Sequence, residues 1–149
     1  MNPCPCGNLL SSVKECRCNE IEIQRYKNRL SEPFLDRVDL YLVMNDSFKD
    51  NKNKVSSKEL HENIIKAFIK QKQRGQKELN GKLSDEEIKK YCILDEESLN
   101  ILEKARFNYQ LSFRSINKVL KVARTIADLN DNEIITKNDL LQSLNFRRR

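Results

Sequence analysis

The chain has 149 residues, of which 38% are hydrophobic and 34% are charged, a polar composition that still allows a modest core. This length suits one ordinary domain or two very small ones and excludes a large enzyme. With only three Gly, three Pro and no Trp, the sequence is a poor match to β-sandwiches and barrels, which need many turns. We therefore expect a mainly α-helical protein.

The charge balance is basic, with 28 Lys and Arg against 22 Asp and Glu and a formal net charge of +6. Such a balance permits contact with nucleic acid or another polyanion without demonstrating it. The terminal run of Arg at 147–149 is shorter than useful basic motifs and fits a solvated tail. Neither a membrane-spanning apolar stretch nor an apolar signal segment after Met1 is present, so we expect no membrane partner and a cytoplasmic location.

Four of the five cysteines lie within the first 18 residues, as two C-x-C pairs with nine residues between them. Four thiolates at paired spacing can surround one tetrahedral zinc ion, and such a centre lets a segment too short for a core fold. C-x-C is a tight spacing that needs kinked backbones, for which Pro3, Pro5 and Gly7 are available. Two disulfides, a redox role, free thiols or an iron–sulfur cluster are the alternatives. The predicted zinc ligands are Cys4, Cys6, Cys16 and Cys18.

The other potential ligands and nucleophiles fit ordinary positions. Cys92 lies on an apolar helical face and is expected in the core. His61 is followed by Glu62, but no second His follows at the spacing of zinc proteases, so we expect it on the surface. No Gly-rich phosphate loop, no G-x-S-x-G motif and no histidine-based triad can be written from the sequence. The chain by itself therefore lacks a complete active site.

Residues 19–44 contain one helical and one strand-like pattern. Asn19, with Glu22 three residues later, predicts a capping box and a helix that ends near residue 31, two residues before a proline. Residues 38–44 alternate apolar positions and are rich in β-branched and aromatic side chains, which predicts a strand. A lone strand cannot bury both faces, so its partners are expected elsewhere.

The pattern changes after a polar stretch. Residues 46–56 are dominated by Asn, Asp, Lys and Ser and indicate a linker. Beyond them apolar residues repeat with the helical period, most clearly in a helix capped by Ser112 that ends in the polar cluster 130–132. Thr136, with Asp139 three residues later, resembles another capping box. We predict three parts: residues 1–45 with the cysteine knuckle, a helix and a strand; a linker over 46–56; and a bundle of four or five helices over 57–149.

Two arginines occupy positions that suit phosphate binding. Arg37 stands at the start of the predicted strand, and Arg114 lies in the first turn of the clearest helix, where the helix dipole disfavours a cation. A planar guanidinium binds phosphate in a bidentate way. Ordinary surface salt bridges are the alternative interpretation of both residues.

Several segments form an ordered series: residues 1–7 (MNPCPCG), 16–18 (CRC), 24–31, 35–40 (LDRVDL) and 122–129 (VARTIADL). Together they resemble the C-terminal part of the magnesium-chelatase-like AAA+ ATPases of the ComM/YifB type. The similarity extends, with gaps, to about Leu144. The chain departs from the family at Ser31-Glu32-Pro33, where Ser-Gly-Pro is usual, and in its unusually Asn- and Lys-rich linker.

The resemblance implies specific roles for three residues. Asn2 matches the sensor-1 position, which orients the attacking water. Arg37 matches the arginine finger, which stabilises transition-state charge at the γ-phosphate bound by the neighbouring subunit, a role worth on the order of 10³ to 10⁵ in rate. Arg114 matches the sensor-2 arginine, which contacts the nucleotide. The resemblance also implies ATP with Mg²⁺ in a full-length protein whose Walker A and Walker B segments lie upstream, and no ATP hydrolysis by this chain alone.

The leading hypothesis is therefore the sensor, arginine-finger and lid region of a hexameric AAA+ ATPase that acts on DNA as a branch-migration motor. Its fold is expected to be mainly α, with a four- to five-helix lid bundle preceded by a remnant of an α/β AAA+ core. The alternative is a free-standing zinc-containing helical module that binds nucleic acid. A weaker third hypothesis is a structural adaptor. Nothing in the sequence indicates a porphyrin substrate.

Overall fold

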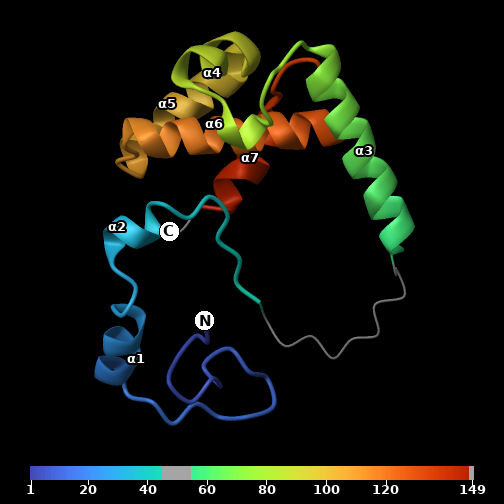
Figure 1. Ribbon diagram of the computed structural model, residues 1–149. Coiled ribbons are helices and arrows are strands. Elements are labelled where there is room, and N and C mark those ends of the chain that lie inside the picture. Colours follow the sequence, from blue (N-terminus) through green and yellow to red (C-terminus); the bar gives the residue numbers. More distant parts are fainter. Residues whose placement is uncertain (45–54, 148–149) are drawn as a thin grey trace. The chain divides into compact units, whose positions relative to one another are not determined.

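The computed structural model describes residues 1–44 and 55–147 (Figure 1). The chain divides into two compact units, Met1–Asn53 and Lys54–Arg149. Seven α-helices, one short 3-10 helix and no β-strand occur in the described residues, so the expected mainly helical class is confirmed. Most of the predicted linker, residues 46–54, and the terminal Arg148 and Arg149 lie outside this part of the chain.

The first unit contains two helices, α1 (Glu20–Lys27) and α2 (Glu32–Leu35). The predicted capping box at the start of α1 is confirmed, because Glu22 N–H donates to Asn19 Oδ1 at 2.9 Å and Asn19 N–H donates to Glu22 Oε2 at 3.0 Å. The helix ends at Lys27, earlier than expected. Pro33 also has a different role from the one predicted, since it lies in the first turn of α2, where its missing N–H costs nothing.

The strand predicted over residues 38–44 is wrong for the described structure, where this segment has no regular secondary structure. Its apolar side chains from Leu40 onward are exposed, and Met44 has 82% of its surface in contact with solvent. A strand is stabilised by hydrogen bonds to a neighbouring strand, and no other described segment supplies one. The alternating sequence pattern therefore indicates that these residues could form a strand, but they do not pair with another strand in the described structure.

The second unit is a helical bundle built around α6 (Phe113–Leu129). Four elements pack against α6, and α5 packs against α7 (Figure 1). The five α-helices agree with the predicted bundle, and the predicted cap Ser112 accepts a hydrogen bond from Ser115 N–H at 3.1 Å. The remaining elements are α3 (Ser57–Gln73), η1 (Asn80–Lys82), α4 (Asp85–Tyr91), α5 (Glu96–Asn108) and α7 (Lys137–Asn145).

The core of the bundle follows the apolar stripe of α6. Val119, Ala123 and Ala127 are buried there, and the small alanines let the neighbouring elements approach closely. Cys92 is buried in the same core, as predicted. Burial raises the pKa of the Cys92 thiol to about 11, so this cysteine stays a neutral core side chain. The other buried members of the core are Leu83, Ile88, Ile135 and Leu140.

A charged network is buried beside this apolar core. Arg124 and Asp128, both on α6, have almost no exposed surface. The Arg124 guanidinium also donates to the carbonyl oxygens of Glu133 at 2.8 Å and Asn132 at 2.7 Å. Asp128 receives further hydrogen bonds from Arg74, at the end of α3, and from Asn80 Nδ2 at 2.8 Å. The network therefore ties α3, η1 and the α6–α7 connection to one face of α6.

Within the described ranges, no helix combines the length and the apolar character that a membrane crossing requires.

Candidate metal centre and candidate phosphate-binding arginines

The four N-terminal cysteines converge on one point. The sulfur atoms of Cys4 and Cys6 are 3.4 Å apart, those of Cys4 and Cys16 are 3.7 Å apart, and those of Cys6 and Cys16 are 3.6 Å apart. All four sulfurs, including that of Cys18, lie within 4.8 Å of one another. The cysteines are free thiols, because a disulfide bond would hold two sulfurs at about 2.05 Å.

Backbone turns make this convergence possible. Gly7 N–H donates to the carbonyl oxygen of Cys4 at 3.1 Å, which closes a turn around Pro5 and brings Cys4 and Cys6 to one side. Gly7 itself has φ +82°, a conformation that side-chain-bearing residues rarely adopt. The turn of the first C-x-C pair is therefore made at Pro5 and Gly7, two of the three residues that the sequence offered for it.

The surroundings of the cluster favour the thiolate form of some cysteines and disfavour it for others. Backbone N–H groups of Asn8 and Arg17, with help from the neighbouring cysteines, lower the pKa of the Cys6 thiol to about 6. The backbone of Cys6 favours the Cys18 thiolate, but desolvation and the three neighbouring sulfurs outweigh it and raise the pKa of Cys18 to about 12. The last protons of the cluster are therefore the hardest to remove, because each new thiolate repels those already present.

The geometry fits a tetrahedral metal ion. With metal–sulfur bonds of about 2.3 Å, the edges of a ZnS₄ tetrahedron measure about 3.8 Å, close to the three sulfur separations above. Cys4 is buried, while Cys16 and Cys18 are partly buried, so the cluster lies partly inside its unit. Four soft thiolate ligands favour Zn²⁺ or iron–sulfur chemistry over Mg²⁺ or Ca²⁺. The arrangement is therefore consistent with a zinc site.

Asn2 lies beside this cluster in the chain and is exposed. Its side chain is close to Gly7, since a Cβ atom placed on Gly7 would be 3.6 Å from Asn2 Nδ2. The side-chain amide is therefore accessible to a ligand from solvent.

Arg37 follows the C-terminal cap residue of α2, Asp36, and is exposed. Its Nη1 donates to the carbonyl oxygen of Pro33 at 2.7 Å, which folds the side chain back over the short helix. No acidic side chain pairs with Arg37 among residues 1–44 and 55–147. One exposed hydrogen bond to a backbone oxygen leaves most of the guanidinium donors available.

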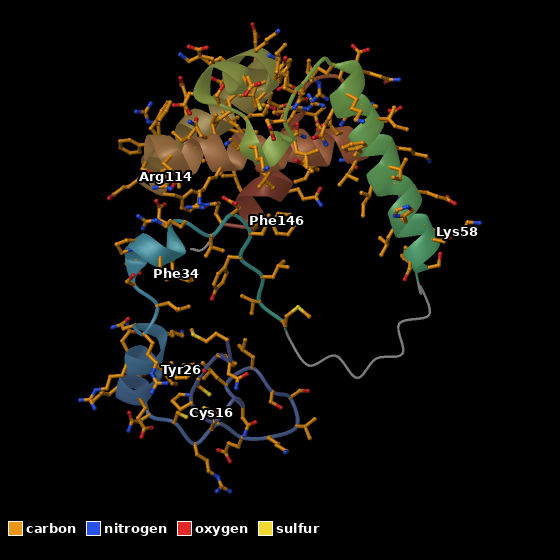
Figure 2. All side chains as sticks on the ribbon, in the orientation of Figure 1. Cys16, Tyr26, Phe34, Lys58, Arg114 and Phe146 are labelled. Carbon is orange, nitrogen blue, oxygen red and sulfur yellow. The ribbon has the colours of Figure 1, made fainter. Side chains whose placement is uncertain are left out.

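Arg114 lies in the first turn of α6, where Figure 2 labels its side chain at one end of the bundle. The side chain is exposed and forms no hydrogen bond or ion pair with another described residue. The first turn of α6 also contains no acidic residue. The positive end of the helix dipole therefore adds to the charge of Arg114, and an anion placed there would be stabilised by both.

One expectation concerned the single histidine, and one buried ion pair was not expected. His61 is exposed on α3, as expected. Sequence reasoning missed the buried role of Arg124 and Asp128, because an i, i+4 pair of opposite charges on a helix is usually a surface feature. The burial of Arg124 could have been inferred from its position next to Ala123, inside the apolar stripe of α6.

Comparisons with known proteins cover almost the whole chain. Residues 54–147 match the family described as "Magnesium chelatase, subunit ChlI C-terminal", and residues 1–52 match "Magnesium chelatase, subunit ChlI". The chain is 37% identical over 155 residues to protein YifB of Salmonella typhimurium, which is uncharacterised. It is 36% identical over 155 residues to YifB of Escherichia coli and 36% identical over 152 residues to competence protein ComM of Haemophilus influenzae.

In each of these three comparisons the aligned region includes 99% of this chain and 29% of the relative. The chain thus spans less than a third of the length of the curated relatives it matches. The family match to residues 54–147 coincides with the helical bundle, and the second match coincides with the unit that contains the cysteine cluster and Arg37. The chain therefore belongs to the magnesium chelatase subunit ChlI C-terminal family and corresponds to the C-terminal region of a ChlI/ComM-type protein.

Proposed function

We propose that this chain forms the sensor, arginine-finger and lid region of an AAA+ ATPase that assembles as a hexameric ring and acts on DNA. The observation that carries the proposal is Arg114, an exposed arginine in the first turn of a helix that the family match includes. Among residues 1–44 and 55–147, its side chain has no hydrogen-bond or ion-pair partner. A cation in this position is unfavourable in the isolated lid and becomes favourable when a phosphate approaches. Arg114 then acts as sensor 2 and couples the position of the lid to the bound nucleotide.

Arg37 supplies the second proposed phosphate contact. Its guanidinium is exposed next to α2, and its one side-chain hydrogen bond within the described residues, to the Pro33 carbonyl oxygen, can be exchanged for water. As an arginine finger it reaches the γ-phosphate bound by the neighbouring subunit and stabilises the charge that develops in the transition state. Asn2 is proposed to orient the attacking water through its exposed side-chain amide.

The cysteine cluster is proposed to bind one Zn²⁺ ion through Cys4, Cys6, Cys16 and Cys18. The proposal is supported by sulfur separations close to the edge of a ZnS₄ tetrahedron. The four cysteines fill all four positions of a tetrahedral Zn²⁺ ion, which leaves no open position for a substrate. The ion would therefore have a structural role. The ion stabilises the short irregular segment that carries Asn2, because this segment has few apolar residues of its own to bury.

The first experiment measures ATP hydrolysis by a full-length protein that contains this chain and carries Walker A and Walker B motifs. Arg37→Ala is expected to lower the turnover by about 10³-fold or more while nucleotide binding stays nearly intact. Arg114→Ala is expected to weaken nucleotide binding or its coupling to turnover. Arg25→Ala on α1 and Lys89→Ala on α4 are the matched exposed controls and should retain wild-type activity.

A mixing experiment tests whether Arg37 acts between subunits. Subunits with Arg37→Ala have an intact nucleotide site but no arginine finger. Subunits with an inactivated Walker A lysine have an intact Arg37 but no functional nucleotide site. If the finger acts across the interface, mixing the two inactive proteins restores part of the activity. Wild-type turnover of Arg37→Ala, or inactivity of every mixture of well-assembled rings, contradicts the assignment.

A further inference from the structure

In one stretch of the helical bundle every charged residue is basic. Residues 104–127 include six Lys and Arg residues and no Asp or Glu, although acidic residues are frequent on both sides. Arg124 is buried against Asp128, and the other five cations reach the surface in full or in part. These five are Lys104, Arg106, Arg114, Lys118 and Lys121.

The same stretch exposes three aromatic rings where α5 meets α6. Phe107 has 85% of its surface in contact with solvent, Phe113 has 64% and Tyr109 has 54%. Three of the chain's aromatic residues, four Tyr and six Phe in all, thus lie within seven positions. Leaving three large rings in water is unfavourable unless something covers them.

The local backbone explains why the rings are at one end of the bundle. Phe107 lies in the last turn of α5, Tyr109 is its C-terminal cap, and Phe113 is the first residue of α6. The connection contains Gln110, which has a positive φ of 48°. The core of the bundle takes its side chains from other faces of these two helices, such as Ile101 and Val119. The junction therefore presents its rings outward.

Two of these five cations, Lys104 and Arg106, differ from the other basic side chains. Lys104 and Arg106 form no hydrogen bond or ion pair through their side chains within the described residues, whereas other basic side chains do. Lys137, for example, pairs with Glu97 at 2.5 Å, and Lys82 pairs with Glu78 at 3.8 Å. The surface around the junction therefore combines exposed rings with uncompensated positive charge.

We propose that the α5–α6 junction binds single-stranded DNA, with bases stacked on Phe107, Tyr109 and Phe113 and backbone phosphates at Lys104 and Arg106. Every base has a π-face that stacks on an aromatic ring, and unpaired Lys and Arg attract the phosphates without selecting a sequence. A duplex fits less well, because its bases are stacked on each other. The inference deepens the proposed function by naming the surface that contacts DNA, and it rests on that function for its biological role.

The test uses the 149-residue chain, a fluorescein-labelled dT₂₀ oligonucleotide and no ATP, so its outcome is independent of the ATPase experiments. The chain contains no Trp, and Phe107→Trp therefore introduces a single reporter at the junction. Stacking of thymine on this indole is expected to quench its fluorescence on titration with dT₂₀. Phe34→Trp, which places the reporter at an exposed ring of the first unit, is the matched control and should show no quenching.

Affinity measured by fluorescence anisotropy separates stacking from charge. Each of Phe107→Ala and Tyr109→Ala is expected to weaken binding at least fivefold. The pair Lys104→Gln and Arg106→Gln is expected to weaken binding and to reduce the slope of log K against log salt by about 1.4. Lys58→Gln with Lys66→Gln, two exposed cations of α3, removes the same charge elsewhere and should have a smaller effect. Circular dichroism verifies that each variant is folded.

Three outcomes overturn the proposal. The first is the absence of dT₂₀ binding at low salt. The second is binding that depends on Lys104 and Arg106 but not on the rings, which indicates a general polyanion contact. The third is a change of oligomeric state in Phe107→Ala, measured by light scattering, with unchanged DNA affinity, which indicates that the rings cover a protein partner.

Discussion

Arg124 and Asp128 lie one turn apart on α6 and form a salt bridge from which solvent is excluded. Arg124 Nη2 and Nε are 2.9 Å and 3.2 Å from Asp128 Oδ1. The same carboxylate accepts from Arg74 and from Asn80, so two guanidinium groups depend on one buried anion. Both residues belong to the VARTIADL segment, by which the chain resembles its family, and their contacts give that segment a structural role.

Removing this anion should destabilise the bundle strongly. Asp128→Ala leaves Arg124 buried without its partner, and the expected loss is about 3 to 5 kcal/mol in the free energy of unfolding. Asp131→Asn removes the charge of an exposed carboxylate that pairs with Lys70. Asn tolerates the positive φ of 67° at this position, so the loss should be much smaller. Urea unfolding followed by circular dichroism measures both changes, and equal losses would contradict the role given to Asp128.

The apolar core should respond to truncation according to burial. Leu140 on α7 is fully buried against the core, so Leu140→Ala is expected to cost about 2 to 5 kcal/mol. Leu99 on α5 is about half exposed, and Leu99→Ala removes the same atoms at a much smaller cost. Thermal unfolding of the two variants side by side tests this difference. A similar loss in both would mean that α7 does not cover the core as described.

Acid should weaken the connection between α6 and α7 through Asp139. Burial by itself raises the pKa of this carboxyl group, but hydrogen bonds from Asn130, Asn132 and Thr136 outweigh burial and lower the pKa. A lowered folded-state pKa stabilises the protein above the unfolded value of about 3.9, and this contribution is lost as pH falls through the folded pKa.

The measurement for Asp139 is the free energy of unfolding between neutral pH and pH 2. Asp139→Asn cannot ionise and should be less stable than the wild-type chain at neutral pH. The difference between the two should shrink below about pH 4. Asp85→Asn is a control on an exposed carboxylate of α4. A difference that stays constant over the whole pH range would show that the ionised form of Asp139 is not what stabilises the fold.

Protein purified without chelators is expected to contain about one zinc ion per chain. Cys18→Ser removes one ligand and should lower the zinc content and affinity, whereas Cys92→Ser, in the core of the other unit, should leave the metal content unchanged. Protons compete with the metal for thiolates, so affinity should fall as pH decreases. Elemental analysis and replacement of zinc by Co²⁺, whose thiolate complexes absorb light, provide the measurements. Metal-free protein with four reactive thiols in the first unit would reject the site.

The helix starts were predictable because a cap is a local interaction. Asn19 with Glu22, and Ser112 with Ser115, are each joined across three residues, so the sequence contains both partners of the bond. The cysteine cluster was also predictable, since paired spacing and a Pro-Gly turn are properties of one short segment. Arg37 and Arg114 were selected by position and resemblance, and their roles remain predictions that the ATPase experiments will test.

The sequence by itself determined where helices begin, which cysteines could share an ion and which family the chain resembles. Only the tertiary structure decided that residues 38–44 form no strand here, because pairing depends on a neighbour that local pattern does not supply. It also decided that Arg124 is buried and that Arg106 is exposed with no side-chain partner in the described part of the chain, although both are arginines on helices. Burial and charge compensation are set by side chains from distant segments, such as Arg74 and Asn80 at Asp128, and these become neighbours only when the chain folds.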